Sequence, residues 1–140
     1  MGKNLNTEFI PIVPQDFNMD NATSVRDYAG YILNSGGAAG QKSAGAGILV
    51  YATKMIPKGF TATSGSLFGS DVTNTVKWFS GSLITSNNAS IKNDVVEAVS
   101  GTGSAYSSGV VGDGLTYVTV EWTPGSSDQV YGGKIYIKPS

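Results

Sequence analysis

Apolar and polar residues alternate along several short stretches of this chain, and turn residues separate the stretches. The clearest case is residues 115–122 (LTYVTVEW), in which Val118, Val120 and Trp122 alternate with polar residues such as Thr119. Side chains of an extended strand point to opposite faces in turn, so this period of two predicts a strand with one buried and one exposed face.

Seven further stretches are predicted to be strands, because they are rich in β-branched and aromatic residues and are bounded by Gly, Pro, Asn or Asp. They cover residues 25–33, 47–56, 60–68, 75–84, 89–99, 105–111 and 130–138. In 75–84, Val76 and Trp78 fall on one face and Lys77 and Phe79 on the other. Residues 89–99 also fit a helical turn, since Ile91, Val95 and Val99 are spaced by four; their β-branched content favours a strand.

About eight strands, with turn signals roughly every 8–12 residues, predict an all-β antiparallel sandwich or barrel. Residues 34–46 (NSGGAAGQKSAGA) interrupt this series with a composition typical of a flexible linker, and they predict a mobile surface loop. The expected organisation is an N-terminal arm or lead-in at residues 1–24 and a single β-sandwich domain at 25–140.

The N-terminal arm contains an apolar segment broken by two prolines. Proline cannot donate a backbone hydrogen bond, so the segment can pair along one edge at most. Two arrangements remain open: a lead-in lying along the domain's own sheet, or an arm that docks on a neighbouring subunit or on a capsid. The candidate contact residues are Phe9, Ile10, Pro11, Ile12, Val13 and Pro14.

The charge of the chain is low and evenly spread. Charged residues make up 14% of the sequence and the net charge is −1, whereas a typical protein has about 25% charged residues. The nine Lys and Arg residues form no cluster, so neither a nucleic-acid nor a membrane partner is expected. A net charge near zero removes one guard against self-association and favours a protein that packs against another surface.

The sequence contains no His and no Cys. A Ser-His-Asp triad, a histidine-bearing zinc site and thiol catalysis are therefore excluded. Asp94 and Glu97 are close in sequence, but this spacing on a strand places them on opposite faces. The sequence predicts a protein that is not an enzyme and needs no cofactor.

One polar segment partly follows the pattern of a calcium-binding loop. Asp16, Asn18, Asp20 and Asp27 occupy positions 1, 3, 5 and 12, but Asn21 replaces the usual glycine at position 6. Position 12 carries Asp rather than a bidentate Glu, and neither flank is helical. A polar turn without a metal ion is the expected structure.

Several aromatic residues raise the alternative of a sugar-stacking face. Burial in the sandwich core or in a subunit interface is the other explanation for each of them. The residues concerned are Trp78, Trp122, Tyr106, Tyr117, Tyr131 and Tyr136.

Four segments resemble small virion proteins of marine tailed phages, including cyanophages. They are residues 56–63 (IPKGFTAT), 67–71 (LFGSD), 76–79 (VKWF) and 131–137 (YGGKIYI). The family pattern reads I-P-K-G-Y/F-x-A-T, then Y-G-S-D, then a closing Y-G-G-x-x-x-I. This chain departs from it by carrying Leu67 and Phe68 before Gly-Ser-Asp. The resemblance covers about half of the chain, roughly residues 50–84 and 115–138.

The resemblance implies a structural virion protein, most specifically a capsid decoration or cement protein with a jelly-roll-like β-sandwich. Such a protein would be made in the host cytoplasm, sit on the capsid surface and bind between subunits of the major capsid protein. The resemblance also implies a homo-oligomer, either a trimer or a dimer. The alternative is a receptor- or carbohydrate-binding tip of a phage head fibre or tail.

Overall fold

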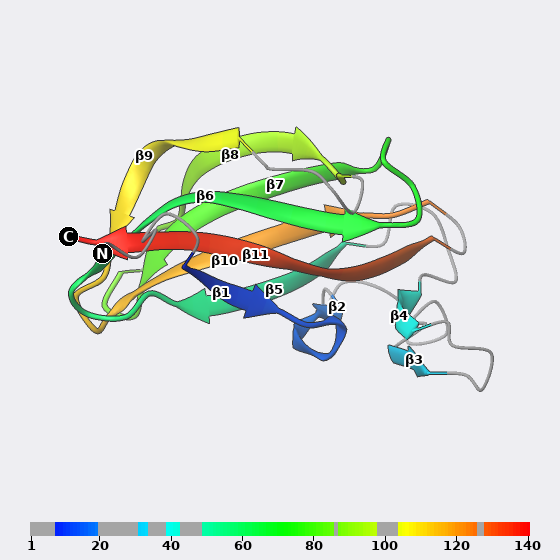
Figure 1. The fold of residues 1–140 in the computed structure, drawn as a ribbon, viewed down its shortest axis with the longest axis horizontal. Coiled ribbons are helices and arrows are strands. Elements are labelled where there is room, and N and C mark those ends of the chain that lie inside the picture. Colours follow the sequence, from blue (N-terminus) through cyan, green and yellow to red (C-terminus); the bar gives the residue numbers. More distant parts are fainter. Residues whose placement is uncertain are drawn as a thin grey trace, which may run out of the picture.

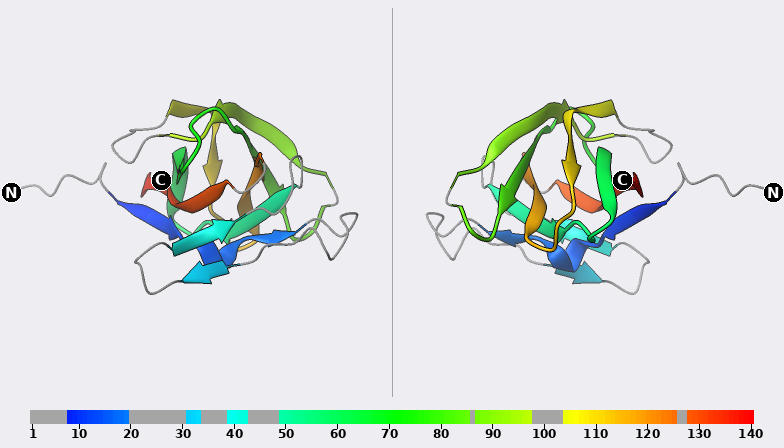
Figure 2. Two further views of the ribbon diagram at one scale, coloured as in Figure 1. Left: turned by 90° about the vertical axis from the view of Figure 1, so that its right-hand side faces the viewer. Right: turned by 90° about the vertical axis from the view of Figure 1, so that its left-hand side faces the viewer.

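The computed structural model describes residues 8–19, 31–33, 39–42, 49–85, 87–97, 104–125 and 128–140. In these ranges the chain forms eleven strands in two antiparallel sheets and one 3-10 turn, η2 (Pro14–Asp16). The sheets pack face to face as a β-sandwich (Figures 1 and 2). The all-β sandwich predicted from the alternation is therefore confirmed.

The first sheet, sheet A, has the strand order β3-β4-β11-β6-β9, and β1 also pairs with β11. Its strands are β1 (Phe9–Ile12), β3 (Tyr31–Leu33), β4 (Ala39–Lys42), β6 (Phe60–Gly69), β9 (Ser104–Val111) and β11 (Gln129–Pro139). Sheet B has the order β2-β5-β10-β7-β8. Its strands are β2 (Asn18–Met19), β5 (Val50–Met55), β7 (Thr75–Ser82), β8 (Ala89–Val95) and β10 (Thr116–Thr123).

The connectivity of the eight strands from β4 to β11 is that of a jelly roll. If these strands are laid out as one long hairpin, β4 faces β11, β5 faces β10, β6 faces β9 and β7 faces β8. Each of these four pairs is hydrogen-bonded, in sheet A and sheet B alternately. Pairing of β11 with β6 and of β10 with β7 then closes the roll.

The core lies between the two sheets and consists of the faces that alternation predicted to be buried. On β10, Val118, Val120 and Trp122 are at most 1% exposed, and on β7 Val76 and Trp78 are equally buried. Sheet A contributes Leu67, Ile135 and other apolar side chains from β6 and β11. The aromatic ring of Trp78 contacts Tyr106 across the sandwich at a centroid distance of 5.7 Å.

The predictions for residues 89–99 and 34–46 have different outcomes. The ambiguous stretch 89–99 forms a strand, β8, over Ala89–Val95, as its β-branched content predicted; residues 98 and 99 lie outside the described residues. The prediction of a loop at residues 34–46 is wrong for the central residues, because Ala39–Lys42 forms β4 and pairs with both β3 and β11. A short segment of small and polar residues gains strand structure here because the partner edge of β11 satisfies its backbone groups. Of the strand predicted at 25–33, only β3 lies within the described residues.

Candidate functional site

Residues 8–19, which we call the strap, cross from one sheet of the sandwich to the other. β1 pairs with β11 of sheet A and β2 pairs with β5 of sheet B. Figure 2 shows this segment, in blue, passing along one open side of the sandwich. Ile12 and Phe17 are 2% and 1% exposed, and the Phe17 ring lies edge-on to Trp122. The strap therefore closes the core between the two sheets.

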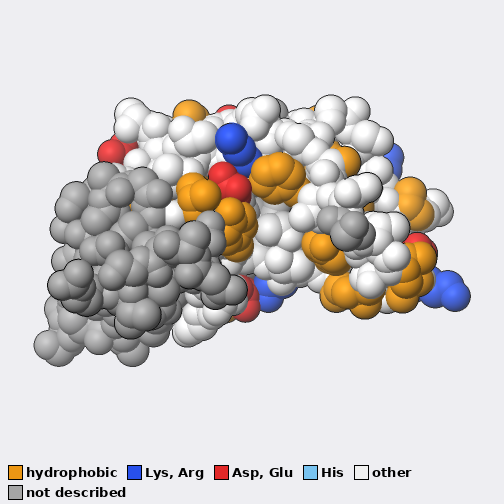
Figure 3. Space-filling view, turned by 180° about the vertical axis from the view of Figure 1, so that it is seen from behind, with side chains coloured by type: hydrophobic (Ala, Val, Ile, Leu, Met, Phe, Trp, Pro, Cys, Tyr) orange, Lys and Arg blue, Asp and Glu red, His pale blue; other side chains and the backbone are white. Residues whose placement is uncertain are grey.

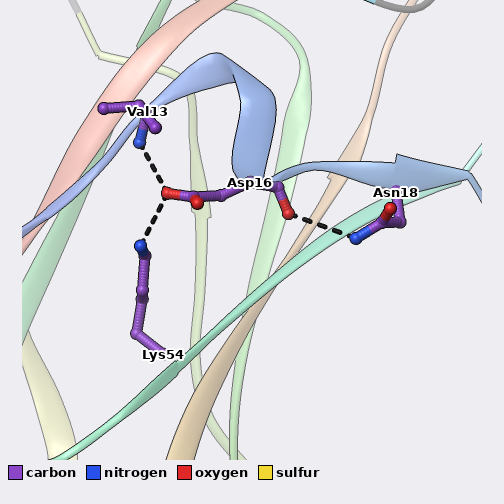
Figure 4. A network of polar contacts seen from close by, with 4 residues as sticks. All are labelled: Val13, Asp16, Asn18 and Lys54. Carbon is purple, nitrogen blue, oxygen red and sulfur yellow. Dashed lines mark hydrogen bonds and ion pairs between the residues drawn. The ribbon is translucent and has the colours of Figure 1, made fainter.

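A carboxylate holds the corner of the strap at η2 (Figure 4). Asp16 accepts a hydrogen bond from the backbone N–H of Val13 at 2.9 Å, and its Oδ2 lies 2.7 Å from Nζ of Lys54. Asp16 is thus engaged by a cation of its own chain. Asn18, another residue of the calcium-like pattern, donates from its side-chain amide to the carbonyl of Asp16; Asp20 and Asp27 lie outside the described residues.

The candidate arm residues alternate between the core and the solvent. Ile12 is buried and Ile10 packs against the core, whereas Phe9, Pro11 and Val13 are exposed. Pro14, half-buried, begins η2. Of the two arrangements that the sequence left open, the structure of the single chain contains the first, because β1 lies along its own sheet. Docking on another protein stays a prediction, and the exposed row Phe9, Pro11 and Val13 is the part of the arm available for it.

An aromatic groove of about 420 Å³ lies beside the strap on the outer face of sheet A. Its lining comes from β1, β6 and β11 and consists of Phe9, Pro11, Ile12, Phe68, Tyr131, Gly132, Gly133 and Lys134. Phe9 and Tyr131 are 42% and 43% exposed. The Phe9 ring meets Tyr136 edge-on at 6.2 Å, and Lys134 Nζ stands 4.6 Å above the Phe9 centroid.

A second apolar surface, the end patch, lies where the β5–β6, β7–β8 and β9–β10 connections meet. Its members are strongly exposed aliphatic residues: Met55, Leu83, Ile84, Val111 and Leu115. Ile84 is 75% exposed and Leu83 64%, and the Leu83 backbone N–H donates to the Leu115 carbonyl at 2.9 Å. Figure 3 views sheet B and shows hydrophobic side chains gathered toward one end of the molecule.

A polar cleft of about 330 Å³ adjoins the end patch between β7, the β7–β8 loop and β9. Hydroxyl groups and an amide dominate its lining, which includes Ser80, Ser82, Thr85, Asn87, Ser108 and Thr116. The cleft carries no charged residue among its described lining residues. Its hydroxyl and amide groups can donate and accept hydrogen bonds.

The aromatic residues named as a sugar-stacking face divide into two groups. Trp78, Trp122 and Tyr106 are buried in the core. Tyr117, Tyr131 and Tyr136 remain accessible, and they do not form one surface, because Tyr117 lies on sheet B and the other two on sheet A. Sequence alternation had placed Tyr117 opposite the core, but no local signal marked Phe9 and Phe68 as neighbours of Tyr131.

The buried polar groups of the core serve packing. Lys92 is buried with its Nζ 2.8 Å from Asp94 Oδ2 and 2.7 Å from the Gly65 carbonyl oxygen. The pKa of Tyr106 is raised above its usual value because burial disfavours the phenolate. Within the described residues no group of three or more acidic, His or Cys side chains is placed to hold a metal ion. The part of the chain that the structure describes also contains no helix long and apolar enough to cross a membrane.

Comparison with models of known protein families, with curated protein sequences and with solved structures finds no match for this chain.

Proposed function

We propose that this chain is a non-enzymatic structural protein of a phage virion that decorates the capsid surface by binding between subunits of the major capsid protein. The observation that carries this function is the end patch. Contiguous aliphatic surface on a protein of this size is typical of protein–protein contact. Leu83 and Ile84 are neighbours in sequence and both project from the same loop, as an inserted anchor would.

The jelly roll supports such a role mechanically. The β7–β8 loop that carries Leu83 and Ile84 joins two strands that pair with each other. Leu83 and Ile84 follow directly after β7, and their backbone N–H groups donate to Leu115 and Ser82, so little conformational entropy is lost when they bind. The exposed row of the strap, Phe9, Pro11 and Val13, offers a second contact for a capsid subunit or for another copy in a trimer or dimer.

A capsid-binding assay tests this function directly. Purified protein is added to expanded, undecorated heads of the phage that encodes it, and the bound fraction is measured by sedimentation. We expect saturable binding by the native protein and at least a hundredfold loss of affinity for a variant with Leu83→Asp and Ile84→Asp together, because two charges would be buried unpaired in the contact.

Val72→Asp is the matched control. Val72 is 49% exposed, but it lies in the turn between β6 and β7, at the other end of the sandwich, so binding should be unchanged. Failure of the native protein to bind heads, or equal binding by the double variant, would show that the function is wrong. Deleting residues 2–14 is a poorer test, since it removes the buried Ile12 together with the exposed residues.

The alternative, a receptor- or carbohydrate-binding tip of a head fibre or tail, is favoured by the aromatic groove on sheet A. The two roles depend mainly on different surfaces of the protein. A capsid contact depends on the end patch, whereas a tip would depend on the groove, so binding assays on the two sets of variants separate them.

A further inference from the structure

The aromatic groove lies at a local irregularity of β11. β1 pairs with β11 as far as Gly133, and β4 pairs with it only at Gln129 and Val130. Tyr131, which lies between these two pairings, is also skipped by β6, where the register shifts from Val130 to Gly132. Tyr131 therefore has no partner in register on any described neighbouring strand, and it is 43% exposed in the lining of the groove.

Gly132 permits this irregularity. Its φ of +143° lies in a region that favours glycine. A Cβ atom at this position would also collide with the carbonyl oxygen of Ile12. A side chain at residue 132 is therefore excluded by the close approach of β1, and the groove at this point is lined by the backbone of β11.

The groove offers flat apolar surfaces and few aliphatic ones. Phe9, Phe68 and Tyr131 supply aromatic rings. Of the aliphatic lining residues, Pro11 is exposed and Ile12 is only 2% exposed. A peptide that docks through aliphatic side chains would need pockets to receive them. A pyranose ring instead presents one flat C–H face, which stacks on the electron-rich face of an aromatic ring.

The charges around the groove favour an uncharged ligand. Lys134 is the one charged residue of the described lining, and its ammonium group already lies over the Phe9 ring. This cation–π contact pairs the ammonium group with one face of the Phe9 ring. Polar contacts then come from neutral groups, namely the phenol hydroxyl of Tyr131 and the backbone at the bulge.

We propose that this groove binds a neutral oligosaccharide, with Tyr131 and Phe9 stacking on successive sugar rings. The hydroxyl groups of the sugar would bond to the Tyr131 phenol and to the backbone at the bulge. Tyr131 and Phe9 are then the residues that determine specificity. This binding site goes beyond the capsid role and does not require it, because the groove is separate from the end patch that carries the capsid contact. Phe9 and Pro11 belong both to the groove and to the exposed row of the strap.

The test uses the full-length protein and soluble neutral oligosaccharides. An array of neutral hexose and N-acetylhexosamine oligomers identifies a binder, and titration calorimetry measures its affinity. Tyr131→Ala should weaken binding about tenfold or more, through loss of a stacking ring. Phe9→Ala should weaken it similarly, whereas Tyr131→Phe should keep most of the affinity because the ring remains.

Tyr117→Ala is the matched control, since Tyr117 is an accessible tyrosine on the other sheet and its loss should leave binding unchanged. Affinity should also be the same at low and high salt, because no charge is involved. Three results would overturn the inference: no neutral oligosaccharide on the array binds, only acidic glycans bind in a salt-dependent manner, or Tyr131→Ala and Phe9→Ala bind like the native protein. Each is independent of whether the end patch binds the capsid, because no groove residue belongs to that patch.

Discussion

The strap can be tested by removing a single buried ring. Phe17 is 1% exposed and contacts Trp122 at a centroid distance of 6.4 Å. Phe9 lies near the beginning of the same strap but is 42% exposed. Phe17→Ala and Phe9→Ala thus make the same chemical change at one buried and one exposed site.

The expected cost of Phe17→Ala follows from its burial. A phenylalanine buries about 200 Å², and at about 25 cal/mol per Å² this corresponds to roughly 5 kcal/mol of transfer free energy. Part of this is retained by the alanine methyl group and by relaxation of the strap, so about 3–4 kcal/mol is expected. Phe9→Ala loses only partial burial and the contact with Lys134, and should cost about 1 kcal/mol.

Urea denaturation followed by tryptophan fluorescence measures both changes, since Trp78 and Trp122 are buried in the core. We expect a lower midpoint for Phe17→Ala with an unchanged slope, which indicates the same surface exposed on unfolding. If both variants cost about the same, and less than about 1 kcal/mol, the strap is not part of the folded core. The arrangement in which residues 8–14 act as a free arm would then be favoured.

Three further substitutions probe the interior and the turns. Gly65→Ala would place a methyl group against the Tyr106 hydroxyl and the Trp78 ring, and should destabilise the protein by about 1–3 kcal/mol in denaturant titration. Tyr106→Phe removes a buried hydroxyl without a hydrogen-bond partner in the described residues, and should leave stability unchanged or raise it by up to about 1 kcal/mol; a clear loss would reveal a missing partner. The pKa of Asp113 is lowered, chiefly by the backbone N–H of Leu115, so its contribution to stability is present above the unfolded pKa of about 3.9 and is lost as the pH falls through the folded pKa. Asp113→Asn should therefore show a smaller loss of melting temperature between about pH 5 and pH 2 than the native protein, and an identical pH profile would refute this role of Asp113.

The candidate contact residues show which features of the strap can be predicted from local sequence and which cannot. Prolines 11 and 14 correctly limited residues 9–14 to pairing along one edge, and β1 does pair with a single strand, β11. No local feature could show which side of the segment would be buried, because Phe9, Ile10, Ile12 and Val13 are all apolar. The partner strand settled this, since pairing Ile12 with Gly133 turns Ile10 and Ile12 toward the core.

The sequence by itself determined most of the longer strands and the buried faces of β7 and β10, because a period of two fixes which side chains share a face regardless of the partner. It also limited the chemistry of the chain, since His and Cys are absent. Only the tertiary structure decided which strands pair, that Ala39–Lys42 becomes β4, and that Phe9, Phe68 and Tyr131 meet at one groove. These features depend on contacts between residues far apart in sequence and on a bulge in β11, and neither leaves a local pattern in the chain.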